Sequence, residues 1–119
     1  MTLPVEETKL FSPRFNEAGL VPVVAQAKSS GAILMLAFAN REAIDRTLKT
    51  GEAHYWSRSR GELWHKGATS GHVQKVVRVL IDCDQDSLIY EVEQQGPACH
   101  TGQPTCFYRE VTEDGLSGA

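Results

Sequence analysis

The chain alternates short apolar segments with turn-forming residues, and this alternation restricts its fold more than any other feature. Residues Leu88, Tyr90 and Val92 fall on one face of an extended segment, as expected for a strand that is buried on one side. Strands are predicted on the same grounds at 21–26, 32–39, 54–59, 63–65, 73–83, 88–93 and 106–111. The sequence therefore predicts an α+β fold that is mostly antiparallel β.

One segment has clear helical signals at both ends. Asn40 is a favourable N-cap, Glu42 would lie in the first turn, and Gly51 suits the C-terminal end. Ile44 and Leu48 are four residues apart and are expected to share the buried face. One or two helices are expected in total.

A chain of 119 residues suits one domain, residues 1–119, with loose ends expected at 1–12 and 112–119. The apolar stretch 32–39 is too short to span a bilayer, and the opening MTLPVEETK lacks the apolar region of a signal peptide. A cytoplasmic protein is expected, with no membrane partner. The net charge of −3 also argues against binding a nucleic-acid backbone.

An acidic cluster surrounds the first of three cysteines. Asp82, Asp84 and Asp86 alternate around Cys83 in the run IDCDQDS. In an extended segment their carboxylates would point to one face, where they repel one another unless a cation such as Mg²⁺ binds them. The alternative is a solvated acidic turn, because Asp is common in turns.

The cysteines lack the paired spacing of structural zinc sites. Cys83, Cys99 and Cys106 offer three thiolates, and catalytic zinc has three protein ligands and an open position. The alternative is three buried apolar thiols. His100 follows Cys99 directly and is predicted to transfer protons beside the metal, and the alternative bases are His54, His65, His72 or water.

The stretch WSRSRGELWHKGATSGH combines cations, hydroxyls and glycines, which is typical of phosphate binding. Trp56 and Trp64 would stack on a purine or fill the core, and core packing is favoured for Trp64. The predicted substrate-binding residues are Trp56, Ser57, Arg58, Ser59, Arg60, Lys66, Thr69 and Ser70.

From about residue 15 to 110 the chain resembles the phosphoribosyl-AMP cyclohydrolase family of histidine biosynthesis, in its monofunctional form. The resemblance is carried by GLVPVVAQ, HYWSRSRGELWHKGATSGH and VLIDCDQDSLIYEVEQQGPACHTGQPTCFYRE. It implies hydrolytic opening of the adenine ring of N1-(5-phosphoribosyl)-AMP, with Zn²⁺ and Mg²⁺ as cofactors. It also implies an intertwined homodimer with sites at the interface.

Transferred to this chain, the resemblance implies Mg²⁺ ligands at Asp82, Asp84 and Asp86. It implies zinc ligands at Cys83, Cys99 and Cys106, with Cys83 supplied by the partner subunit. The chain departs from the family pattern at Ala68, where Glu is common, and at Thr105, where Ser is usual. A carboxylate role at residue 68 is therefore absent or supplied elsewhere.

Two other functions fit a zinc-binding chain. A zinc deaminase acting on a purine or nucleoside would need an H-x-E motif before P-C-x-x-C, and the sequence has none. A non-catalytic zinc module would bind a partner and would have a fourth tight protein ligand.

Overall fold

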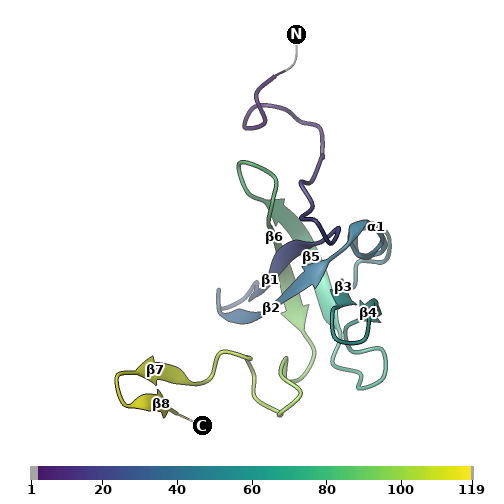
Figure 1. Ribbon diagram of the computed structural model, residues 1–119. Coiled ribbons are helices and arrows are strands. Elements are labelled where there is room, and N and C mark those ends of the chain that lie inside the picture. Colours follow the sequence, from purple (N-terminus) through teal and green to yellow (C-terminus); the bar gives the residue numbers. More distant parts are fainter. Residues whose placement is uncertain (1–2, 119) are drawn as a thin grey trace.

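The computed structural model describes residues 3–118. A twisted sheet of six strands forms its body, in the order β4-β3-β2-β1-β6-β5, and a separate two-stranded hairpin, β7-β8, lies near the C-terminus (Figure 1). The elements are β1 (Val21–Ala27), β2 (Ile33–Ala39), α1 (Arg41–Thr50), β3 (His54–Ser57), β4 (Glu62–His65), β5 (Gln74–Ile81), β6 (Leu88–Gln94), β7 (Glu110–Thr112) and β8 (Gly115–Ser117).

The elements and their pairing confirm an α+β fold that is mostly antiparallel, with one helix among residues 3–118. The exception is the pair β1 and β6, which run parallel with Val23 opposite Leu88 and Ala25 opposite Tyr90. All four side chains are buried, so this register brings the apolar faces of both strands to the same side. Among the described residues no helix has the length and apolar character needed to cross a membrane.

Helix α1 begins and ends as the sequence predicts. The Asn40 Oδ1 atom accepts the amide of Ala43 at 2.9 Å, and Gly51 closes the helix with a φ of +77°. Ile44 is fully buried, but Leu48 is 57% exposed, so the expectation of a shared buried face is wrong for Leu48. The buried face runs through Thr47 instead, whose hydroxyl donates to the Ala43 carbonyl at 2.8 Å.

Each predicted strand differs from the observed one by at least one residue, and two differ most. The strand expected at 73–83 ends at Ile81, because Asp82 turns the chain by accepting backbone amides. The strand expected at 106–111 is limited to β7, because the Cys106 amide donates to the Leu34 carbonyl at 2.7 Å and keeps that part of the chain in a loop. Of the ends expected to be loose, residues 1–2 and 119 lie outside the described residues, and 115–117 form β8.

Candidate metal centre and adjoining pocket

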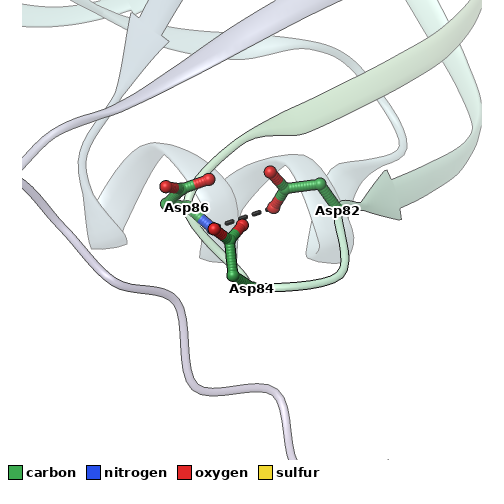
Figure 2. Close-up of side chains that lie close together, drawn as sticks. All are labelled: Asp82, Asp84 and Asp86. Atoms are coloured by element: carbon green, nitrogen blue, oxygen red, sulfur yellow. Dashed lines mark hydrogen bonds between the residues drawn. The ribbon is translucent and has the colours of Figure 1, made fainter. Parts of the chain in front are cut away.

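The three aspartates gather in the tight turn between β5 and β6 (Figure 2). Their carboxylate oxygens lie within 4.8 Å of one another. The sequence prediction that they converge is confirmed, but the reason given for it, strand alternation, is wrong. Asp82 Oδ1 accepts the amides of Asp86 at 2.9 Å and Ser87 at 3.1 Å, and these bonds fold the turn so that Asp84 and Asp86 face Asp82.

Hydrogen bonds and repulsion divide the charge unequally within the turn. The Ser87 hydroxyl donates to Asp82 Oδ2 at 2.7 Å and, with the amides, holds the pKa of Asp82 well below its usual range. Side-chain hydrogen bonds with Asp82 and Asp84, with a smaller contribution from the repulsion of these carboxylates, raise the pKa of Asp86 to about 6. Asp86 therefore resists ionisation beside its two neighbours.

Gln85 fastens the N-terminal arm to the acidic turn. Its Oε1 accepts the Ser12 amide at 2.8 Å, and its Nε2 donates to the Leu10 carbonyl at 3.2 Å. Its carbonyl also accepts the Arg14 amide at 2.7 Å. Gln85 is buried, and it is the only non-glycine residue among the described ones with a positive φ, at 60°. The arm therefore supports the turn in a backbone conformation that side chains rarely adopt.

Gln85→Ala should destabilise the metal-free protein by about 1–3 kcal/mol, because it removes two side-chain hydrogen bonds from a buried position. Gln85→Gly should lose the same bonds but cost less, since glycine adopts the positive φ without strain. Urea unfolding measures both. The matched control is the exposed Gln95→Ala, expected within about 0.5 kcal/mol of wild type. A Gln85→Ala protein as stable as wild type would contradict this role.

A short loop after β6 holds the other two cysteines. Cys99 is buried and accepts a hydrogen bond from the Thr101 hydroxyl at 3.0 Å, which lowers the pKa of its thiol. Cys106 lies in hydrogen-bonding contact with Cys99, and partial desolvation together with this neighbour raises its pKa. The Thr105 hydroxyl donates to the Ile33 carbonyl at 2.7 Å and anchors the loop to the start of β2.

Lys66 lies against this cysteine loop. Its ammonium donates to the Ala98 carbonyl at 2.8 Å and sits 5.6 Å from the centre of the Trp64 ring. Burial lowers the pKa of Lys66, and the nearby Cys106 and Cys99 oppose that shift. The ammonium of Lys66 therefore lies near the thiols of Cys99 and Cys106 in this structure. The predicted contact of Lys66 with a phosphate group stays a prediction.

Cys83 lies at the opposite end of the sheet from Cys99 and Cys106. It belongs to the turn before β6, whereas the other two follow the end of β6 (Figure 1). The seven residues of β6 separate the two ends by roughly 20 Å at about 3.3 Å per residue. Within residues 3–118 of one chain, the three thiols are therefore not brought together.

A pocket of about 640 Å³ opens beside the cysteine loop. Six of the residues predicted for the site line it: Arg60, Lys66, Thr69, Ser70, Cys99 and His100. His65 and His72, predicted only as alternative bases, line it as well. Leu63, Trp64 and Ala68 also line it and were not predicted for the site, although the WHKGATSGH segment was the available signal for them.

The GATSG loop forms one wall of this pocket. Gly67 has a φ of +83°, and a Cβ there would collide with the backbone of His72 and Val73. The Gly71 amide donates to the Gly67 carbonyl at 2.8 Å and closes the loop. Glycine at residue 67 is therefore required by close approach, and it brings Thr69 and Ser70 to the pocket.

The remaining predicted substrate residues line a second hollow of about 470 Å³. Trp56, Ser57, Arg58 and Ser59 are found there, and Arg60 borders both spaces. The Arg58 guanidinium lies 4.0 Å from the centre of the Phe38 ring. The eight predicted residues thus fall into two adjoining groups.

Comparisons with known proteins agree on one family. The sequence profile of phosphoribosyl-AMP cyclohydrolase matches residues 35–108. The phosphoribosyl-AMP cyclohydrolase of Acidiphilium cryptum is 54% identical over 116 residues, which cover 98% of this chain and 97% of that protein. The enzyme of the same name from Archaeoglobus fulgidus is 59% identical over 101 residues, covering 85% and 94%.

A longer relative also matches. The histidine biosynthesis bifunctional protein HisIE of Deinococcus radiodurans is 61% identical over 107 residues, which cover 90% of this chain. The match covers 49% of that protein, so this chain spans about half its length.

Proposed function

The chain belongs to the phosphoribosyl-AMP cyclohydrolase family, and from this membership we propose that it hydrolyses the C6–N1 bond of the adenine ring of N1-(5-phosphoribosyl)-AMP in histidine biosynthesis. The proposed product is the ring-opened formimino carboxamide. A cytoplasmic location follows for such a biosynthetic hydrolase and is part of the proposal.

The pocket beside the cysteine loop is the observation that carries this function. It combines hydroxyls and a cation on one wall with Cys99 and His100 on the other. A phosphorylated nucleotide needs the first group for its phosphates, and ring hydrolysis needs the second near the reacting carbon. A volume of about 640 Å³ suits a ligand of nucleotide size.

The donor groups fit the two metals that the family implies. Asp82, Asp84 and Asp86 supply hard oxygen ligands for Mg²⁺, and the raised pKa of Asp86 reflects its hydrogen bonds to the neighbouring carboxylates and the repulsion among the three, which a cation would relieve. Cys99 and Cys106 supply two adjacent sulfurs for zinc, and the lowered pKa of Cys99 favours the thiolate that binds metal. When bound, zinc supplies Lewis acidity and lowers the pKa of coordinated water.

The third zinc ligand is proposed to come from a second chain. Cys83 is exposed and lies too far from Cys99 and Cys106 to join them within one chain. A homodimer would place Cys83 of one chain beside the other two cysteines of its partner.

An uncovered apolar face of the sheet supports such a dimer. Pro22, Val24, Leu36 and Ile89 line a hollow of about 600 Å³ on this face, and Leu36 is 51% exposed. Burying such a surface is favourable at about 25 cal/mol per Å². Asp82 lines the same hollow, so a second chain packed here would lie next to the acidic turn.

His100 is proposed to move a proton during ring opening. It lines the pocket, directly follows Cys99 and is exposed, so it can approach the reacting ring while Cys99 contacts Cys106. The hydroxyls of Thr69 and Ser70 would bind phosphate, and Trp64 on the pocket wall offers a stacking surface for the base.

Purified protein should convert phosphoribosyl-AMP with the ultraviolet absorbance change of adenine-ring opening. Prolonged treatment with a strong chelator should remove both metal ions and with them the activity. Adding Zn²⁺ with Mg²⁺ should restore the activity, because the proposed reaction needs both ions bound to their ligands. Heat-inactivated protein given the same metals is the control. A folded, metal-loaded protein that leaves the substrate unchanged would refute the proposed function.

A further inference from the structure

A carboxylate and an imidazole form a close pair at the pocket beside the cysteine loop, and the imidazole lines that pocket. Glu52 lies between α1 and β3, and its Oε1 is 2.6 Å from Nε2 of His65 on β4. His54 is opposite His65 in the β3–β4 ladder, and the two rings stack with centres 4.4 Å apart and planes 9° apart. The His65 ring is therefore held from one edge and from one face.

These contacts determine which nitrogen of His65 carries hydrogen. A carboxylate only accepts hydrogen bonds, so the Nε2 atom facing Glu52 must be the donor, and in the neutral ring the lone pair is left on Nδ1. His54 Nδ1 is engaged with the Glu52 carbonyl at 2.8 Å, and burial lowers the pKa of His54. The His54 ring, which burial favours in its neutral form, therefore packs on the face of His65 and does not take up the proton that His65 would accept.

The free nitrogen is available to a ligand. His65 lines the pocket of about 640 Å³, and its ring makes no other hydrogen bond within the described part of the chain. Glu52 and His54 contact the His65 ring, and Arg46 lies near His54. The charged and titratable groups that line the same pocket are Arg60, Lys66, His72, Cys99 and His100.

We propose that His65 is the general base of the ring-opening reaction, with Nδ1 as the accepting atom, and that Glu52 is its positioning residue. This inference rests on the proposed function, because the proton transfer is assigned to that reaction. A carboxylate behind an imidazole holds the correct tautomer and stabilises the imidazolium that forms.

The proton movements balance without any further reactant. Counted from the neutral imino form of the ring, one O–H bond of water breaks, its electron pair forms the O–C6 bond, and its proton passes to Nδ1 of His65. The C6–N6 π pair moves onto N6, which takes that proton from His65. The C6–N1 bond then breaks with its pair left on N1, and His100 passes the remaining hydroxyl proton to N1 as the carboxamide C=O forms.

Two variants of the metal-loaded protein test the pair by pH–rate profiles. His65→Gln should lower kcat by about 100- to 10,000-fold with little change in KM, and the acid limb of the profile should disappear. Glu52→Gln should lower kcat less and move the acid limb to lower pH, because the imidazolium that forms on His65 loses the carboxylate that stabilises it. Glu93→Gln, an exposed carboxylate on β6, is the matched control and should leave the profile unchanged.

The circular dichroism spectrum and the zinc content of each variant must match those of wild type, which separates a loss of proton transfer from a folding defect. If His65→Gln does not fold, Glu52→Gln provides the test. A wild type that opens no ring overturns the proposed function itself. A wild type that is active while His65→Gln keeps its kcat and acid limb overturns only the role of His65. A Glu52→Gln profile identical to wild type overturns the positioning role.

Discussion

Cys99→Ala should lose both bound zinc and ring-opening activity. Wild-type protein is expected to hold close to one zinc ion per chain, because thiolates dominate zinc affinity in such a ligand set. Cys99 is buried, touches Cys106 and accepts a hydrogen bond from Thr101, so its sulfur is the best oriented of the three. Elemental analysis of purified protein, alongside the absorbance assay, measures both losses.

His100→Asn is the matched neighbour for this experiment. It changes the adjacent pocket residue without removing a proposed ligand, so it should keep its zinc while kcat falls by about 100- to 10,000-fold. Full zinc in Cys99→Ala would exclude the proposed ligand set. Loss of zinc from His100→Asn would make His100 a ligand instead.

Co-expression of Cys83→Ala and Cys99→Ala chains should restore activity that neither variant has alone. In a mixed dimer, one of the two sites contains both substitutions. The other site is intact, because it takes Cys83 from the Cys99→Ala chain and both Cys99 and Cys106 from the Cys83→Ala chain. With equal expression, about a quarter of wild-type activity is expected, since half of the dimers are mixed and each regains one of two sites. Differently tagged chains allow the mixed dimer to be purified and assayed.

The matched control is the mixed dimer of a Cys99→Ala chain with a Cys106→Ala chain. Both substitutions lie in the same cysteine loop, so no arrangement of the two chains completes a site, and these mixed dimers should stay inactive. Purified Cys83→Ala/Cys99→Ala dimers without activity would contradict a site shared between chains. Activity in the control would show that the cysteines do not act as one ligand set.

Local signals in the sequence predicted most of the elements. Asn40 and Gly51 mark the ends of α1, since capping depends on residues only a few positions apart. Leu88, Tyr90 and Val92 predicted the buried face of β6 because alternation is a property of the strand alone. The exposure of Leu48 was missed, since it depends on how α1 is rotated against the sheet.

Pairing between distant segments was less accessible. Nothing in β1 or β6 separately indicates that they run parallel, because that arrangement follows from the path of the chain through α1 and four further strands. The loop around Cys106 was predicted as a strand, since its backbone bond to Leu34 joins residues far apart in sequence. The Glu52–His65 pair was missed for the same reason: the β3–β4 ladder and the loop after α1 bring it together.

The sequence by itself determined the chemistry available to this protein: three carboxylates around one cysteine, two further thiols, and a loop of cations and hydroxyls. Residue identity sets which ligands and charges exist. Only the tertiary structure decided which of these groups meet. The Asp82 turn gathers the carboxylates, and the length of β6 keeps Cys83 apart from Cys99 and Cys106, because hydrogen-bonded strands are rigid and hold their two ends at a defined separation.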